Sequence, residues 1–186
     1  MRCQPNLIFE TTAMTPTMTS HPLRIAVLTV SDTRDETTDK SGALLCELLT
    51  RDGHIRADKR IVTDDKYQIR AVLSAWIADP DVQAVIITGG TGFTGRDITP
   101  DAISPLFDKT IEGFGELFRQ ISYTEIGTST MQSRALGGLA NGTLIFGLPG
   151  SSNACRTGWE KLLRDQLNIA HKPCNFAELI PRFMER

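Results

Sequence analysis

DVQAVIITGGTGFTGRDITPDA, residues 81–102, contains in order an apolar run, a glycine-rich loop and the first residues of a helix. The apolar run at 84–87 is short and rich in β-branched residues, which predicts a buried strand within 81–88. After the loop, Thr99-Pro100 matches a helix N-cap followed by proline at the first helical position. Strand, loop and helix in this order indicate an α/β fold.

The rest of the chain repeats this alternation. Apolar runs of strand length predict strands at 23–30, within 55–62 and at 143–148. Helical spacing of apolar residues predicts a helix between an N-cap at Ser41 and a stop at Gly53, and another around 69–77 with Asp64 or Asp65 as its cap. Further helices are expected near 103–107, 114–121 and 155–163. The hydroxyl-rich segment 120–138 is interpreted as an ordinary turn and helix, with the alternative that its Ser133-Arg134 borders the ligand cleft. We therefore expect a mostly parallel sheet between layers of helices, with the carboxyl ends of its strands at one edge.

Composition narrows the class of protein. Of the 186 residues, 23% are charged, and the net charge of −2 argues against a nucleic-acid or membrane-surface binder. No apolar run approaches the roughly 20 residues of a membrane span, and the scattered cysteines form no CxxC pair. These features predict a single cytoplasmic domain at 23–186, preceded by a flexible arm at 1–22. The histidines lack metal-ligand spacing and are expected at the surface.

The glycine-rich loop is the first candidate site. Its residues Gly89, Gly90, Thr91 and Gly92 form neither a GxxxxGK[ST] phosphate loop nor a GxGxxG dinucleotide motif. Free backbone amides in such a loop can still hold an anion, and Arg96 could neutralise a phosphate. The alternative is a tight connection between strand and helix that binds nothing, with Arg96 exposed to solvent.

A second turn follows the last predicted strand. It contains Pro149, Gly150, Ser151 and Ser152 at the start of a helix, where hydroxyls and amides suit a phosphate ester. Plain capping of the helix by Ser152 or Asn153 explains the same residues without a ligand. Because both turns follow strands of one parallel sheet, we expect them at the same edge.

Two carboxylates, Asp64 and Asp97, lie near predicted helix starts, and either could simply cap its helix. A carboxylate beside an anion-binding loop repels phosphate unless a divalent cation lies between them. Mg²⁺ takes one or two carboxylates plus substrate phosphates. The pattern therefore favours a Mg²⁺ site for phosphoryl or nucleotidyl transfer, in which positioning and charge neutralisation carry most of the catalysis.

These motifs resemble those of the MoaB/MogA family of molybdenum cofactor biosynthesis proteins. Beside TGGTGFTGRDITPDA, the chain contains LTVSDTR, DKSG, EGFGELFRQISYTEIGTS and LPGSSNACRTGWEKLL in the family's order. The segments ACRTGWE and KPCNF resemble the MoaB branch. The resemblance extends from Leu23 to the carboxyl terminus.

The resemblance implies a three-layer α/β/α molybdopterin-binding fold that assembles as a homo-trimer or hexamer. It also implies a reaction in which ATP and molybdopterin give adenylyl-molybdopterin and pyrophosphate, with Mg²⁺ required. Asp97 and Asp64, the latter beside Asp65, match the family's catalytic and metal-binding carboxylates. The GGTG residues match its nucleotide-phosphate loop, and residues 149–152 match the turn that holds the pterin.

The acidic element after the loop bears on activity. Some members of the MoaB branch lack this element and do not catalyse, whereas RDITPDA is intact here. The resemblance therefore implies an active adenylyltransferase. The alternative is a non-catalytic carrier or scaffold that retains molybdopterin in the same cleft.

Overall fold

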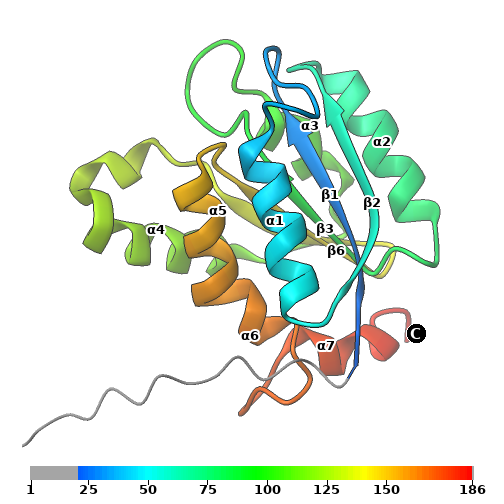
Figure 1. The fold of residues 1–186 in the computed structure, drawn as a ribbon. Helices are drawn as coiled ribbons and strands as arrows, with labels where there is room; N and C mark the ends of the chain where they lie inside the picture. The colour runs from blue at the N-terminus through cyan, green and yellow to red at the C-terminus, as the bar shows by residue number, and fades with distance from the viewer. Residues whose placement is uncertain (1–20, 186) are drawn as a thin grey trace, which may run out of the picture.

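A six-stranded sheet forms the centre of the protein. The computed structural model describes residues 21–185 (Figure 1). The strand order is β2-β1-β3-β6-β5-β4. The first four strands in this order are parallel, whereas β5 and β4 run antiparallel to their neighbours. The bounds are β1 Arg24–Val30, β2 Ile55–Val62, β3 Ala84–Thr88, β4 Lys109–Thr110, β5 Leu136–Ala140 and β6 Thr143–Leu148.

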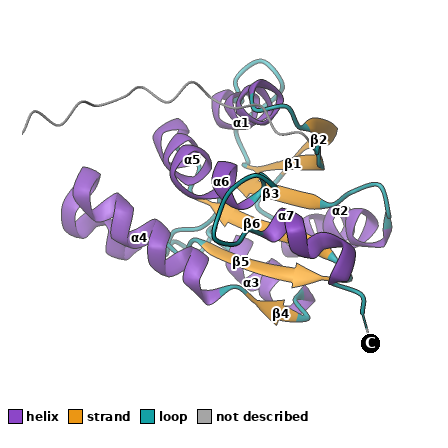
Figure 2. Cartoon of the chain, turned by 90° about the horizontal axis from the view of Figure 1, so that it is seen from below, coloured by secondary structure: helices purple, strands orange, loops and turns teal. Residues whose placement is uncertain are grey.

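Helices cover both faces of the sheet (Figure 2), which confirms the predicted three-layer α/β/α fold with a mostly parallel sheet. On one face lie α1 (Lys40–Arg51), α4 (Glu112–Ile126) and α5 (Ser152–Gly158), and on the other lie α2 (Lys66–Ala78) and α3 (Thr99–Ile103). A π-helical turn, Trp159–Leu163, continues α5 into α6. The remaining short elements are α6 Arg164–Gln166, α7 Phe176–Leu179 and the 3₁₀ turns Ser104–Leu106, Gly127–Gln132 and Ile180–Arg182.

The central strands are apolar on both faces because each face is covered by helices. In β1, Val27 belongs to the core beneath α1 and α5, while its neighbour Leu28 belongs to the core beneath α2 and α3. Ile86 and Ile87 of β3 divide between the two cores in the same way. Successive side chains on a strand point to opposite faces, so a continuous apolar run fills both layers.

The strand order changes direction between β1 and β3, and this change places the candidate site. From β1 the chain crosses to β2 at the edge, and it then returns to form β3 on the other side of β1. In open α/β sheets, ligands bind beyond the carboxyl ends of the strands at such a point. The segment 31–39 follows β1 and the glycine-rich loop follows β3, so both border this position.

Several helix starts differ from those predicted. Asp39, which is buried, caps α1 in place of Ser41, because its Oδ1 accepts from the Gly42 amide at 2.9 Å. Asp65 caps α2, accepting from two backbone amides. Thr99 is the first residue of α3 and makes no capping hydrogen bond there. The assignment of the α2 cap to Asp65 leaves the Asp64 carboxylate available for another role.

The interpretation of segment 120–138 as only a turn and helix is wrong at its end. Residues 136–140 form β5, which pairs with both β6 and β4. A Cβ at Gly138 would lie 2.3 Å from the Phe107 ring, so the strand needs glycine where that ring packs on it. Glycine is depleted in strands, and a strand built on Gly137-Gly138 therefore gives no propensity signal.

Other predictions fall partly outside the described residues. The arm predicted for residues 1–22 lies outside the described residues except for positions 21 and 22, and Cys3 lies outside them as well. Cys46 and Cys155 are buried free thiols, and Cys174 is an exposed one. Within residues 21–185, no helix has both the length and the apolar character needed to cross a bilayer.

The expectation of a surface histidine is wrong for His54. Its side chain is buried, its Nδ1 accepts from the Leu23 amide at 3.2 Å, and its ring meets the edge of Trp159 at 5.8 Å. The Trp159 indole in turn donates to the buried Asp52 carboxylate at 2.7 Å. Burial lowers the pKa of His54 from its ordinary value of 6.5 to about 4, although the charge of Asp52 opposes the shift.

This buried histidine predicts an acid-sensitive stability. Between pH 6.5 and about 4 the unfolded chain binds a proton that the folded chain does not, so the free energy of unfolding falls as the pH drops through this window. The change His54→Asn keeps an acceptor for Leu23 but cannot titrate, and it should flatten this slope in urea unfolding. The native protein, unfolded in urea over the same pH range, gives the reference slope. An unaltered slope in the His54 variant would contradict the assignment.

Candidate functional site

The glycine-rich loop passes very close to the end of β1. Gly89 has φ 107° and Gly90 has φ 61°, backbone conformations that residues other than glycine rarely adopt. A Cβ at Gly89 would lie 2.2 Å from the carbonyl oxygen of Val30. Thr99, in the first turn of α3, holds the loop from the other side: its amide donates to the Gly90 oxygen at 2.9 Å and its hydroxyl donates to the Gly89 oxygen at 2.8 Å.

The second turn lies directly against this loop, as the sequence predicted. The Gly89 amide donates to the Leu148 oxygen at 3.0 Å, and the Thr88 hydroxyl donates to the Pro149 oxygen at 3.1 Å. A Cβ at Gly150 would lie 3.3 Å from the Cα of Gly89. The two turns therefore form one continuous surface at the carboxyl ends of β3 and β6.

The cap of α5 is Ser151, not Ser152 or Asn153 as the alternative to ligand binding supposed. The Ser151 Oγ accepts from the Ala154 amide at 3.1 Å. Ser152 is the first residue of the helix and is exposed. Capping thus explains one hydroxyl of this turn and leaves the other to solvent or a ligand.

Asp64 and Asp97 both lie against the loop. A Cβ at Gly90 would come within 3.1 Å of Asp64 Oδ1, and one at Gly92 within 2.9 Å of Asp97 Oδ2. The Asp97 carboxylate also accepts from the Thr94 amide at 2.8 Å and from its hydroxyl at 2.6 Å. The backbone amides of the loop, the Asp97 carboxylate and the Asp64 carboxylate from the end of β2 thus lie close together.

The surroundings push the pKa values of the two carboxyl groups in opposite directions. The hydrogen bond from the Thr94 hydroxyl is the largest cause that lowers the pKa of Asp97. Burial raises the pKa of Asp64, and the negative charges of Asp32 and Asp97 raise it further. Asp64 is therefore the carboxylate whose ionised form the protein alone leaves less stabilised.

The donor atoms fit a magnesium ion. Mg²⁺ prefers oxygen ligands and is usually bound by one or two carboxylates together with substrate phosphates. Asp64 and Asp97 supply that kind and number of protein donors. In the described part of the chain, no group of three or more His, Cys, Asp or Glu residues is arranged to hold a metal, so an ion here would need ligands from water and substrate.

Arg134 belongs to the site, which confirms the alternative that Ser133-Arg134 borders the cleft over the favoured interpretation of an ordinary turn and helix. Its Nε donates to the Gly92 carbonyl oxygen at 2.7 Å, its Nη1 to Asp101 Oδ2 at 2.9 Å, and its Nη2 to the backbone carbonyl oxygen of Asp97. Its guanidinium also stacks on the exposed Phe93 ring, 5.4 Å from the centroid. Arg134 therefore holds the loop through the carbonyl oxygens of Gly92 and Asp97. These contacts join segments about 40 residues apart, so only the tertiary structure shows them.

Arg96 lies at the rim of the loop but is not free in solvent. Its Nε and Nη2 donate to the two oxygens of Asp32 at 2.8 Å and 2.6 Å. Asp32 follows β1, and its pKa is lowered chiefly by this hydrogen bond from Arg96. The pair joins the segment after β1 to the loop after β3.

A cavity of about 190 Å³ opens beside the two turns. The sequence singled out Thr91, Pro149, Ser151 and Asn153 of its lining, and Ser133 as an alternative, but most of its wall comes from α4 and the 3₁₀ turn after it. Within it, Glu125 accepts from the Thr157 hydroxyl at 3.0 Å and from the Asn153 amide at 3.1 Å. The lining residues are Thr91, Phe118, Ser122, Glu125, Ile126, Ser129, Thr130, Gln132, Ser133, Pro149, Ser151, Asn153 and Ala154.

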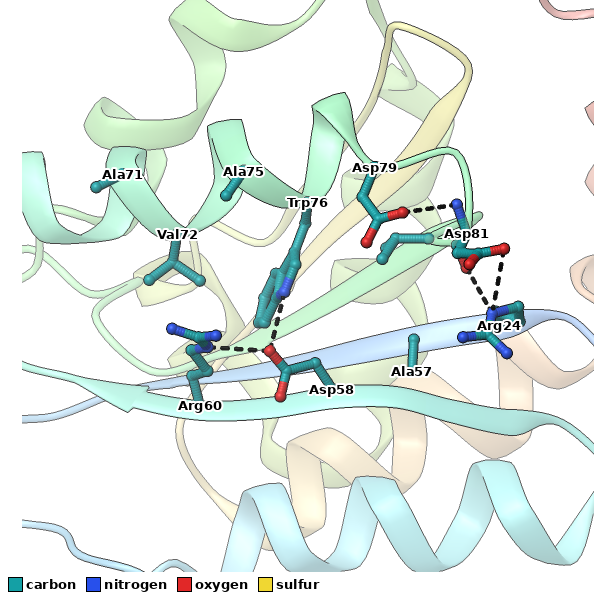
Figure 3. A pocket seen from close by; sticks show the side chains of 11 residues that line it. Arg24, Ala57, Asp58, Arg60, Ala71, Val72, Ala75, Trp76, Asp79 and Asp81 are labelled. Carbon is teal, nitrogen blue, oxygen red and sulfur yellow. Dashed lines mark hydrogen bonds and ion pairs between the residues drawn. The ribbon is translucent and has the colours of Figure 1, made fainter.

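A larger cavity, of about 480 Å³, lies between β2 and α2 (Figure 3). The charged side chains that line it form hydrogen bonds within the cavity wall. Asp58 accepts from Arg60 at 2.9 Å and from the Trp76 indole at 3.2 Å, and Arg24 donates to the Asp81 carbonyl oxygen at 2.9 Å. None of the residues of the two turns borders it. The chemistry of the candidate site thus lies at the strand ends, away from this cavity.

Comparison with known proteins identifies the family. Residues 26–169 match the domain family described as "Probable molybdopterin binding domain". The chain belongs to this molybdenum cofactor biosynthesis family. Molybdenum cofactor biosynthesis protein B of Escherichia coli is 56% identical over 155 residues, covering 83% of this chain and 91% of that protein. The protein of the same name from Bacillus cereus is 50% identical over 146 residues, covering 78% and 86%.

Solved structures of the family share the fold. A crystal structure of molybdenum cofactor biosynthesis protein B matches with a TM-score of 0.77 and 48% identity, over 83% of this chain and 94% of that one. The tungsten cofactor synthesizing protein MoaB from Pyrococcus furiosus matches with a TM-score of 0.70 and 40% identity, over 77% and 92%. The family match at residues 26–169 spans both turns and both carboxylates, so it includes every candidate site residue.

The bonds of Arg134 predict how firmly the loop is held. The change Arg134→Met keeps the aliphatic stem but removes every donor to the loop. It should speed hydrogen exchange at the amides of residues 92–97 and lower the free energy of unfolding by about 2 kcal/mol, the scale of lost charged hydrogen bonds. As a control, Arg156→Met removes an exposed helical ion pair with Glu160 and should cost less than about 0.5 kcal/mol. Unchanged exchange in the loop would show that Arg134 does not hold it.

Proposed function

We propose that this protein transfers the adenylyl group of ATP to the phosphate of molybdopterin, as a step of molybdenum cofactor biosynthesis. An oxygen of the molybdopterin phosphate forms a bond to the α-phosphorus of ATP. The bond from that phosphorus to the bridging oxygen breaks, and its electron pair leaves with pyrophosphate. The observation that carries the proposal is the joining of two anion-binding turns with two carboxylates, Asp64 and Asp97, at a single glycine loop.

The loop amides would bind and stabilise the transferred phosphoryl group. Gly89, Gly90, Thr91 and Gly92 bring backbone close to the ligand, and hydrogen-bond donors fixed in advance stabilise charge that develops during transfer. Thr99 and Arg134 hold this backbone rigid through the bonds described above. Arg96 would meet the remaining phosphates at the rim.

Asp64 and Asp97 would hold Mg²⁺. When bound, the ion neutralises the triphosphate and makes its phosphorus easier to attack. The hydrogen bond from Thr94 holds the Asp97 carboxylate in position and lowers its pKa. Burial raises the pKa of Asp64, and a cation beside it would stabilise its ionised form. Both carboxylates would thus orient nucleotide and acceptor without taking part in covalent chemistry.

The pterin end would lie on the second turn. Pro149, Gly150, Ser151 and Ser152 face the same surface as the loop, and the cavity of about 190 Å³ continues from them toward α4. Its hydroxyl-rich wall, with Phe118 within it, offers both polar partners and an aromatic surface to a flat heterocycle. Molybdopterin would in this way reach from the cavity to the loop, with its phosphate toward the nucleotide.

We also propose that the protein acts as a homo-trimer or hexamer. The exposed apolar side chains of α4 are Leu117, Tyr123 and Ile126, at 49%, 59% and 51% of their surface, and Met131 beyond the helix is exposed at 75%. Large apolar side chains gathered along one projecting helix are typical of a subunit contact. The family resemblance supplies the two candidate assemblies.

Removing either carboxylate's charge tests the proposal. Asn can accept the same hydrogen bonds as Asp but cannot neutralise a cation, so Asp97→Asn and Asp64→Asn should each lower pyrophosphate release from molybdopterin and Mg-ATP by about 100-fold or more. The neighbouring change Asp65→Asn should leave the rate nearly unchanged, because Asn caps a helix as well as Asp does.

Two results would contradict the enzyme. A near-native rate in either the Asp64 or the Asp97 variant would remove that carboxylate from the mechanism. Tight molybdopterin binding by the native protein with no pyrophosphate release would instead indicate the carrier or scaffold function.

A further inference from the structure

Asp32 occupies a junction that the proposed mechanism leaves unused. It lies in the segment after β1, and its two oxygens accept from Nε and Nη2 of Arg96 at 2.8 Å and 2.6 Å. Its Oδ1 also accepts from the backbone amide of Asp64 at 3.1 Å. One carboxylate therefore connects the ends of β1 and β2 to the glycine loop after β3, and it touches both a rim arginine and a candidate metal-binding residue.

The geometry of the pair fixes the arginine. Two parallel hydrogen bonds to one carboxylate set the plane of a guanidinium, which a single contact does not do. Asp32 is the only acceptor for the Arg96 side chain among residues 21–185, and 64% of that side chain is exposed. Without Asp32, Arg96 would sample many rotamers in solvent.

The pair also leaves donors for a ligand. A guanidinium has five N–H donors, and the Asp32 carboxylate takes one from Nε and one from Nη2. The donors of Nη1 and the second donor of Nη2 make no bond to the described residues. A phosphate can therefore bind this arginine without displacing Asp32.

Stability does not account for the pair. Both side chains are exposed to water, Arg96 at 64% and Asp32 at 38%, and exposed ion pairs contribute little to folding. Three negative carboxylates around one loop also repel each other and any nucleotide. An ion pair that contributes little to folding but fixes an arginine at the rim of an anion-binding loop is typical of a binding site.

We infer that Asp32 is a positioning residue that holds the Arg96 guanidinium in place for the β- and γ-phosphates of a bound nucleoside triphosphate. This inference rests on the proposed function only in placing a nucleotide at the glycine loop. Asp32 contacts no substrate, and its effect on binding passes through Arg96.

Calorimetric titration with Mg-ATP tests the inference through a double-mutant cycle. Asp32→Asn keeps an oxygen for the Asp64 amide but breaks the two-point grip on Arg96, and Arg96→Met removes the guanidinium. Each single change should weaken Mg-ATP binding about tenfold, the scale of a charged hydrogen bond. The double variant should bind no more weakly than Arg96→Met alone, since Asp32 acts through Arg96.

Two controls separate positioning from damage to the fold. Glu36→Gln breaks an exposed ion pair with Lys59 in the same segment, and it should leave Mg-ATP affinity unchanged. Adenosine, which has no phosphates, should bind the native protein and the Asp32 variant equally. A structural defect would weaken both ligands.

The outcomes distinguish this inference from the proposed function. Unchanged Mg-ATP affinity in Asp32→Asn, or additive losses in the double variant, would overturn the role of Asp32 alone. Non-additive losses would support it even if no pyrophosphate is released with molybdopterin. Failure of the native protein to bind Mg-ATP would overturn both.

Discussion

The close approach of the loop backbone to the end of β1 is the constraint on which the site depends. At Gly89 the chain passes so near the Val30 oxygen that no side chain fits between them, and the left-handed conformations of Gly89 and Gly90 turn it sharply there. That turn brings the loop against Gly150 after β6 and Asp64 after β2. Segments distant in sequence thus meet at the point where the strand order reverses, as open α/β sheets require of a ligand site.

The charges at the site suit the proposed ligand, which carries both signs of charge. Asp97 is satisfied by Thr94 within its own loop, and Asp32 is satisfied by Arg96. Asp64 is half-buried, and burial raises its pKa. A cation relieves Asp64, and an anion uses the loop amides and the rim arginine. A metal–nucleotide complex supplies both at once, which favours the adenylyltransferase over a protein that only carries the pterin.

The sequence predicted the layers of the fold and the meeting of the two turns, because apolar strands and glycine turns are local signals. It could not show what depends on distant contacts. Gly137-Gly138 conceals β5, since the reason for glycine there is the ring of Phe107. Arg134 lies far along the chain from the loop that it holds, and His54 is buried by Trp159, more than a hundred residues away. The caps at Asp39 and Asp65 depend on which of several polar neighbours turns inward.

The most direct test of this account is a crystal of the protein grown with Mn²⁺ and a non-hydrolysable ATP analogue, with the ion located by its anomalous scattering. The account predicts one ion between the carboxylates of Asp64 and Asp97 and the oxygens of the nucleotide phosphates, with those phosphates against Gly89 to Gly92. An ion bound away from both carboxylates, or phosphates bound at another face of the protein, would contradict it.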